Sequence, residues 1–303
     1  MALSRRDFLK YCGMSAVALG LSTTDLLNLE EALANPGGPS VLWLHGSGCS
    51  GCSISFLNRV SGTAPTTVAD LLVNSINLVY HPTISAVGGE AAVALINQTY
   101  NNGKYILIVE GGVPTAFGGN ACIAWSSGGR DVTFQQAVTK LASKASHILS
   151  IGTCAAWGGV SASGSNIAGV RSVKSFAGKK TVINIPGCPP HPDWIVWTVS
   201  QILLKKKIKL DKSGRPVTLF SKTVHSLCPR RDSDEASTFG IPGRCLEELG
   251  CRGPETHANC PTIKWNGGVS WCIGTNSPCI GCTEPTFPGT ASFYSEGEGD
   301  EDD

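Results

Sequence analysis

Residues 41–52 read VLWLHGSGCSGC, a continuous apolar run followed at once by a glycine-rich turn with two cysteines. Four later stretches share the short, apolar character of this run, namely residues 76–80 (INLVY), 105–109 (YILIV), 148–151 (ILSI) and 182–185 (VINI). Such runs are typical of parallel strands that are buried on both faces. Helix-like patterns occur between and after them, at residues 86–97, 134–146 and 193–206. The alternation predicts an α/β fold with a doubly wound parallel sheet.

Three of the predicted strands are followed closely by a cysteine. These cysteines are Cys49, Cys154 and Cys188. Ligands of doubly wound sheets bind beyond the carboxyl ends of the strands. We therefore expect the three thiols to meet at one edge of the sheet.

The character of the chain changes after about Thr218. Cysteine, proline, glycine and asparagine dominate as far as Pro288, and the alternation of strands and helices fades. This composition predicts an irregular second domain in which bound cofactors take the place of a conventional core. Residues 295–303 form an acidic end, which is typical of a solvated tail.

Overall composition excludes some classes of function. The chain has 303 residues, of which 42% are hydrophobic and 16% charged, with a formal net charge of +1. This length allows one or two domains with a sizeable core. Because no excess of positive charge is present, nucleic acid is not an expected partner.

The amino terminus has the features of an export signal. Residues 4–10 (SRRDFLK) form a twin-arginine pattern, residues 13–22 are apolar, and residues 32–34 (ALA) resemble a cleavage site. The apolar run is too short for a stable membrane anchor. An amphipathic first helix is the alternative. We predict that residues 1–34, with Cys12, are removed and that the folded protein is exported to the periplasm.

The chain has thirteen cysteines, so twelve remain without Cys12. Six disulfides are one reading for an exported protein, but disulfide-dense scaffolds are usually short chains without a core. The C-x-x-C pairs Cys49/Cys52 and Cys279/Cys282 instead favour chelation of a metal. A zinc ribbon would bring two such pairs close together in sequence, whereas these lie at opposite ends. Iron–sulfur clusters, which accept thiolates from distant loops, fit better.

Two further motifs bear on this choice. Gly46, Gly48 and Gly51 spell G-x-G-x-x-G after a strand, with Asp70 downstream, as in dinucleotide-binding domains. Cys49 lies inside that turn, and the export signal points to a compartment poor in nicotinamide cofactors, so we favour glycines that allow close approach to a cluster. In the second motif, His225-x-x-Cys228, the histidine is predicted to be a neutral cluster ligand.

An ordered set of motifs then resembles the small subunit of nickel–iron hydrogenases. The motifs are residues 49–52 (CSGC), 110–114 (EGGVP), 152–154 (GTC), 186–190 (PGCPP), 225–228 (HSLC) and 278–285 (PCIGCTEP). The resemblance covers essentially the whole chain. It implies a flavodoxin-like domain at residues 35–215 with a proximal cluster, and a domain at residues 216–294 with medial and distal clusters.

The resemblance also implies the ligands of three [4Fe–4S] clusters. The proximal ligands would be Cys49, Cys52, Cys154 and Cys188. The distal ligands would be His225, Cys228, Cys245 and Cys251. The medial ligands would be Cys260, Cys272, Cys279 and Cys282. Cys122 is left over and is expected to be a buried free thiol.

Cys272 is where the sequence departs from the commonest pattern of the family. Most members have Trp-Pro before the last C-x-x-C, and this chain has Trp271-Cys272. A fourth thiolate allows four irons, as in the nickel–iron–selenium branch, whereas without Cys272 the medial cluster would be [3Fe–4S]. Gly48, where many members have glutamate, agrees with that branch.

The function implied is electron relay in a periplasmic hydrogenase. A separate large subunit, the obligate partner, would hold the bimetallic site that activates H2 and any selenocysteine. A multihaem cytochrome c would receive the electrons. Because the chain ends in acidic residues we expect no membrane span, although a partner could attach it to the membrane. The alternatives are the related iron–sulfur subunit of respiratory complexes, which lacks the cysteine-rich half, and a secreted disulfide-bonded binding protein.

Overall fold

A five-stranded parallel sheet forms the centre of the protein in the computed structural model, which describes residues 38–62 and 65–289. Its strand order is β2-β1-β3-β6-β7. The strands are β1 (Ser40–His45), β2 (Asn77–Tyr80), β3 (Ile106–Glu110), β6 (His147–Ile151) and β7 (Val182–Ile185). Counted along the chain this is the order 2-1-3-4-5 of flavodoxin-like sheets. The predicted α/β fold and all five predicted strands are confirmed.

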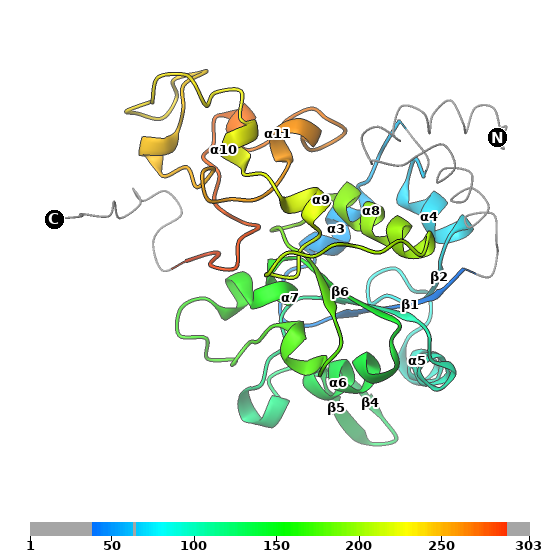
Figure 1. The fold of residues 1–303 in the computed structure, drawn as a ribbon. Helices are drawn as coiled ribbons and strands as arrows, with labels where there is room; N and C mark the ends of the chain where they lie inside the picture. Colours follow the sequence, from blue (N-terminus) through cyan, green and yellow to red (C-terminus); the bar gives the residue numbers. More distant parts are fainter. Residues whose placement is uncertain (1–37, 63–64, 290–303) are drawn as a thin grey trace, which may run out of the picture.

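Helices cover both faces of the sheet (Figure 1). One face packs against α5 (Gly89–Asn102) and α6 (Phe134–Lys144), and the other against α3 (Gly51–Leu57), α4 (Val68–Asn74) and α8 (Pro192–Leu203). Side chains of a strand point alternately to the two faces. Leu42 and Leu44 accordingly join the cluster of Phe134, whereas Val41 and Trp43 join the cluster of Trp194.

The three predicted helices exist, with shifted ends. The helix predicted at residues 86–97 is α5, which begins after Gly88 and ends before Gly103, where φ is +68°. The one predicted at residues 134–146 is α6, which a capping box of Thr133 and Gln136 begins. The one predicted at residues 193–206 is α8. It ends at Leu203, close to Lys205, whose φ of +52° cannot continue a helix.

Several elements were not predicted. A hairpin of β4 (Ile123–Ser127) and β5 (Arg130–Thr133) is inserted before α6. The short α7 (Thr153–Trp157) follows β6 directly. Three 3₁₀ turns complete this part, namely η1 (Ala116–Gly119), η2 (Gly159–Ala162) and η3 (Val173–Phe176).

Residues 216–289, the described part of what we call the carboxyl-terminal half, contain only very short elements. They are α9 (Val217–Phe220), α10 (Val224–Leu227), η4 (Glu247–Leu249), α11 (Cys260–Ile263) and η5 (Ile273–Thr275). In Figure 1 this half, coloured yellow to orange, lies beyond α9, on the side of the sheet that carries α3 and α8. The expectation that cofactors replace a core here is corrected in part. Phe220, Leu246, Trp271 and Ile273 are buried and extend the same cluster that contains α8.

Some predictions concern residues outside the described part of the chain. The signal peptide at residues 1–34 and the acidic tail at residues 295–303 both lie there. Within residues 38–62 and 65–289, no helix combines the length and the apolar character needed to cross a bilayer.

Candidate metal centres

The first cluster of thiols forms where three strands end. β1 leads to Cys49 and Cys52 at the start of α3, β6 leads to Cys154 in α7, and β7 leads to Cys188. We call these four residues the sheet-edge group. Burial, the Glu110 carboxylate and the other three thiols all raise the pKa of Cys52 well above its usual range. The convergence predicted for the ends of the strands is therefore present.

Glycines leave room beside these thiols. Gly152 has a φ of +87°, and a Cβ there would lie only 2.5 Å from Cys52 Sγ. A Cβ at Gly51 would lie 3.1 Å from Cys49 Sγ. The four thiols supply the ligands of an iron–sulfur cluster, and the glycines, which have no side chain, leave space for it. The residues present therefore fit the cofactor that the sequence implies.

The other glycines of the G-x-G-x-x-G motif have a packing role. A Cβ at Gly46 would lie 2.4 Å from both the carbonyl oxygen of Gly112 and the Phe134 ring. Ser47 and Gly112 exchange two backbone hydrogen bonds, at 2.9 and 2.7 Å. The turn thus packs closely against the loop after β3. This packing explains the glycine at position 46, and no bound dinucleotide is needed to explain it.

A buried polar network lies directly behind Cys52. Glu110 is fully buried and accepts hydrogen bonds from Trp43 Nε1 and from the backbone N–H of Ser53, each at 3.0 Å, and from the Ser53 hydroxyl. His81 Nδ1 accepts from the Thr83 N–H at 3.1 Å. The other ring nitrogen of a neutral His81 therefore carries the proton and donates to Ser53 Oγ, 3.2 Å away. Glu110 belongs to the EGGVP motif noted in the sequence, whereas no motif points to Ser53 or His81.

The second cluster, the histidine group, consists of His225, Cys228, Cys245 and Cys251. Thr223 caps α10 and so fixes the helix turn that contains His225. His225 and Cys245 have potential ligand atoms within 4.8 Å of each other. Burial raises the pKa of Cys251, with further contributions from the thiols of Cys245 and Cys228.

Two neighbours of the histidine group were not predicted. A Cβ at Gly253 would lie 3.4 Å from Cys251 Sγ and 3.7 Å from His225 Cβ, so Gly253 lies in van der Waals reach of two of the four residues. Glu247 Oε2 lies 3.7 Å from His225 Nδ1. No sequence motif distinguishes either of them from the other glycines and acidic residues nearby.

The third cluster, the central group, consists of Cys260, Cys272, Cys279 and Cys282. Burial raises the pKa of Cys260 to about 12 and that of Cys279 to about 11. Burial and the other three thiols raise the pKa of Cys282. Cys272, the residue that departs from the commonest family pattern, therefore lies with this group.

Free thiols are gathered in each of the three groups. All twelve cysteines of the described residues are free thiols, and Cys122 belongs to none of the groups. Burial and mutual repulsion disfavour the thiolate form in each group. Four neighbouring ligand residues therefore do not stabilise the fold by themselves. Bound metal cations remove the repulsion, because they deprotonate and hold thiols.

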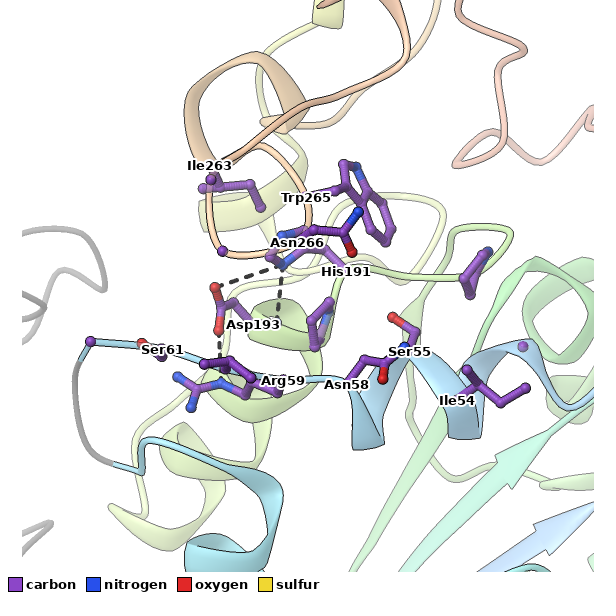
Figure 2. Close-up of a pocket in the computed structure, with 17 residues that line it drawn as sticks. Ile54, Ser55, Asn58, Arg59, Ser61, His191, Asp193, Ile263, Trp265 and Asn266 are labelled. Carbon is purple, nitrogen blue, oxygen red and sulfur yellow. Dashed lines mark hydrogen bonds and ion pairs between the residues drawn. The ribbon is translucent and has the colours of Figure 1, made fainter. Parts of the chain in front are cut away.

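A pocket of about 410 Å³ lies beside the sheet-edge group (Figure 2). Gly51 and Pro189, the neighbours of Cys52 and Cys188, line one side of it. Arg59 donates to Asp193 at 2.8 Å on its floor, and Trp265 closes it from the carboxyl-terminal half.

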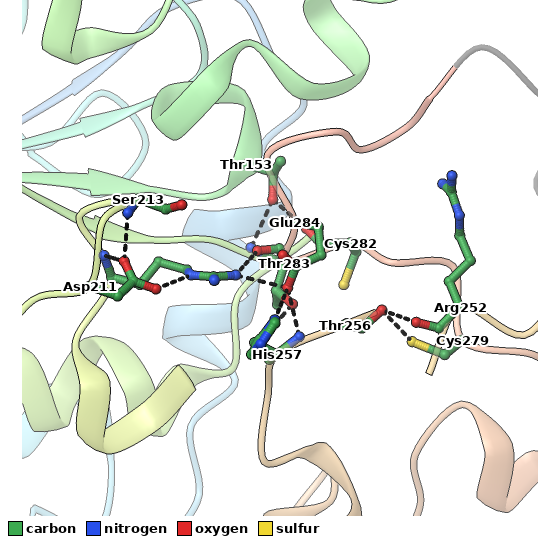
Figure 3. Close-up of polar contacts among 12 residues, drawn as sticks. Thr153, Asp211, Ser213, Arg252, Thr256, His257, Cys279, Cys282, Thr283 and Glu284 are labelled. Atoms are coloured by element: carbon green, nitrogen blue, oxygen red, sulfur yellow. Dashed lines mark hydrogen bonds and ion pairs between the residues drawn. The ribbon is translucent and has the colours of Figure 1, made fainter. Parts of the chain in front are cut away.

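A buried arginine joins the two halves of the chain. Arg215 donates to Asp211 and to Glu284 at 2.8 Å each, and to the carbonyl of Thr283 at 3.1 Å. Figure 3 shows three of the residues in this contact, Asp211, Thr283 and Glu284, with Cys282 nearby. The segment that contains Cys282 is therefore fixed to the loop between α8 and α9.

Comparisons with known proteins agree with this geometry. A family profile described as "NADH ubiquinone oxidoreductase, 20 Kd subunit" matches residues 49–202, and a profile of the C-terminal part of the NiFe/NiFeSe hydrogenase small subunit matches residues 220–295. The periplasmic [NiFeSe] hydrogenase small subunit of Desulfomicrobium baculatum is 38% identical, over 97% of this chain and 99% of its own. The periplasmic [NiFe] hydrogenase small subunit of Solidesulfovibrio fructosivorans is 40% identical, over 97% and 94%.

A solved structure gives the same result. One chain of the recombinant [NiFeSe] hydrogenase from Desulfovibrio vulgaris Hildenborough superimposes with a TM-score of 0.79 at 38% sequence identity. The match covers 85% of this chain and 98% of the other. The match at residues 220–295 separates the chain from the respiratory subunits, which the first profile alone would also describe.

Proposed function

The chain belongs to the NiFe/NiFeSe hydrogenase small-subunit family, and from this premise we propose that it relays electrons through three [4Fe–4S] clusters. The complete enzyme is a hydrogenase whose H2-activating metal site lies in a partner large subunit. The clusters would accept and release single electrons. This chain would connect that site with a multihaem c-type cytochrome.

One observation supports the relay most strongly. The eleven cysteines and the one histidine predicted as ligands fall into three separate groups of four, and Cys122 is left out. Four ligands per group match the ligand number of a four-iron cluster. We assign the proximal cluster to the sheet-edge group, the medial cluster to the central group and the distal cluster to the histidine group.

Contacts between the groups support this order. The central group touches both of the others. The hydroxyl of Thr153, next to Cys154, donates to the carbonyl of Cys282, and the N–H of Cys279 lies 3.3 Å from Cys251 Sγ. An electron that crosses from the sheet-edge group to the histidine group would therefore pass through the central group.

Cys272 supports a four-iron medial cluster. Its thiol adds to the electrostatic repulsion on Cys260, Cys279 and Cys282, as a fourth ligand of the same cluster would. We therefore propose [4Fe–4S] for this site and place the chain closest to the nickel–iron–selenium branch. The selenocysteine of that branch would belong to the large subunit.

The surface at the sheet-edge group suits a large, obligate partner. Cys49 and Cys188 are exposed, and Ile54 and Val60 beside them are 55% and 71% exposed. Clustered exposed apolar side chains are typical of protein–protein interfaces. We propose that this surface is buried against the large subunit, with the metal site of that partner near the proximal cluster.

The opposite end of the relay suits a transient partner. The His225 side chain remains 28% exposed, so the histidine group lies near solvent. Small, short-lived interfaces are usual for electron-transfer partners. We propose that the cytochrome docks here, in the periplasm, after export by the twin-arginine route and removal of residues 1–34. Membrane association, if any, would come through a partner.

We propose two domains from the positions of the three groups along the chain. Residues 35–215 would hold the proximal cluster, and residues 216–294 would hold the medial and distal clusters. The hydrophobic cluster that contains α8 continues across residue 216, so the two parts would fold together.

The proposed function is tested in the purified heterodimer with Cys228→Ser. Exchange between H2 and deuterons needs only the large subunit, whereas reduction of cytochrome c needs the whole relay. We expect the variant to retain the exchange and to lose most of the cytochrome reduction. Cys122→Ser, at a free thiol outside the three groups, is the matched control and should retain both. Cytochrome reduction at the wild-type rate by Cys228→Ser would contradict the relay.

A further inference from the structure

A buried hydroxyl connects the sheet-edge group with the central group, which are also joined by a hydrogen bond from the backbone N–H of Cys188 to the thiol of Cys282. Thr153 is the first residue of α7 and is only 1% exposed. Its Oγ1 accepts a hydrogen bond from the backbone N–H of Gly187 at 2.9 Å and donates one to the carbonyl of Cys282. Its own backbone N–H donates to the carbonyl of Gly187 at 3.1 Å. Figure 3 shows the threonine beside the segment of Cys282.

The covalent neighbours of these atoms make the contact significant. Thr153 precedes Cys154, and Gly187 precedes Cys188, so both belong to loops that deliver thiols of the sheet-edge group. Cys282 belongs to the central group. One oxygen atom thus fixes two loops of the first group to each other and to a residue of the second.

The next gap along the relay is also crossed by hydrogen bonds. Between the central group and the histidine group, the N–H of Cys279 points to Cys251 Sγ at 3.3 Å, and the N–H of Arg252 donates to the carbonyl of Cys279 at 2.8 Å. Both donors are main-chain groups. A buried threonine takes part here too, because Thr256 Oγ1 lies 3.5 Å from Cys279 Sγ and donates to the carbonyl of Arg252, next to Cys251. Thr153 differs in that its hydroxyl also holds together two loops that deliver thiols of one group.

We propose that Thr153 is a positioning residue that sets the separation and the electronic coupling of the proximal and medial clusters. This inference rests on the proposed function, because it requires clusters in both groups. Electron transfer slows steeply as the gap between donor and acceptor widens, and a covalent path closed by a hydrogen bond couples two centres better than an open gap. Removing the hydroxyl leaves the N–H of Gly187 and the carbonyl of Cys282 without this partner in a buried place, and the two segments are then expected to separate.

The experiment uses the cluster-loaded heterodimer with Thr153→Val, which keeps the shape of the side chain, and Thr153→Ser, which keeps the hydroxyl. The matched control is Thr198→Val. Thr198 is also fully buried, and its hydroxyl also donates to a main-chain carbonyl, that of Trp194 at 2.8 Å, but within α8 alone. Thr153→Ala removes the hydroxyl without adding bulk and provides the same test if valine does not fit.

Two readouts are needed. The first is the EPR splitting caused by magnetic interaction between the reduced proximal and medial clusters. The second is the ratio of cytochrome reduction to hydrogen isotope exchange. With iron content unchanged, we expect Thr153→Val and Thr153→Ala to lower both several-fold, and Thr153→Ser and Thr198→Val to leave both near wild type.

The inference is overturned if the variants without the hydroxyl keep the wild-type splitting and ratio, or if Thr153→Ser loses as much as they do. Its failure is distinguishable from failure of the proposed function. A wild-type enzyme without iron in this chain would end the proposed function, whereas full iron with unaltered coupling would end only the role of Thr153.

Discussion

Replacement of Arg215 by methionine is expected to loosen the attachment of residues 281–287 to the sheet domain. The Arg215 side chain is 6% exposed and forms ion pairs with Asp211 and with Glu284, whose side chain is 14% exposed. Methionine fills much of the same volume but removes every donor. Glu284 would keep its contacts with the backbone N–H and the ring Nδ1 of His257, at 2.6 and 3.3 Å, but would lose the buried guanidinium group.

The size of the effect follows from this burial. Removing one member of a buried ion pair costs about 3–5 kcal/mol, because the other charge stays in the interior unpaired. At about 1.4 kcal/mol for each factor of ten, local opening would become roughly 10² to 10⁴ times more frequent.

Amide hydrogen exchange of the assembled enzyme measures this opening directly. We expect the loss of protection to be confined to the loop around Asp211 and to residues 281–287, with the sheet unchanged. Glu284→Gln added to Arg215→Met should recover part of the loss, because it removes the unpaired charge, and the coupling should be about 0.5–3 kcal/mol. Arg231→Met, at an exposed pair with Asp232, is the control and should change nothing measurable. Protection reduced less than tenfold, or equally by both arginine variants, would refute the reasoning.

Three further predictions follow from the buried groups. Burial lowers the pKa of His81 to about 4, so the contribution of neutral His81 to stability is complete above a pH of about 6.5 and is lost as the pH falls toward 4. Between these pH values, urea unfolding should show that the wild type loses up to about 3 kcal/mol more stability than His81→Gln. The same dependence of stability on pH in both proteins would contradict this prediction. Extrusion of the clusters should remove amide protection from residues 218–288 before residues 106–110, because only short elements hold that half together, and simultaneous loss would argue against this. Cys272→Pro should convert the medial cluster to a three-iron form, with a new EPR signal in the oxidised state and about one iron fewer per chain; an unchanged spectrum and iron count would show that Cys272 is not a ligand.

The strands were predictable because parallel strands buried on both faces appear as continuous apolar runs. The β4–β5 hairpin was missed, although Gly128 and Gly129, both with positive φ, supplied the signal of a tight turn between its strands. Short helices such as α7 were missed for another reason. Five residues are too few to show a period, and such a helix exists only through its contacts with β6, β7 and the loops around it.

The candidate ligands were accessible to sequence reasoning because cysteine, histidine and their spacings are rare and chemically specific. Their supporting residues were not. Thr153 and Arg215 act across 129 and 69 residues of chain, and neither threonine nor arginine signals such a role by its type. Glu247 lies near His225 only because the loops of the carboxyl-terminal half fold back on each other.

The central claim is that three groups of four residues in this chain each hold a four-iron cluster. Crystals of the heterodimer, measured on both sides of the iron absorption edge, would locate every iron atom in the chain. Three separate anomalous peaks are expected, one within each group of four, together accounting for about twelve iron atoms. A group without iron, a zinc signal in its place, or cysteines of the three groups joined in disulfides would contradict it.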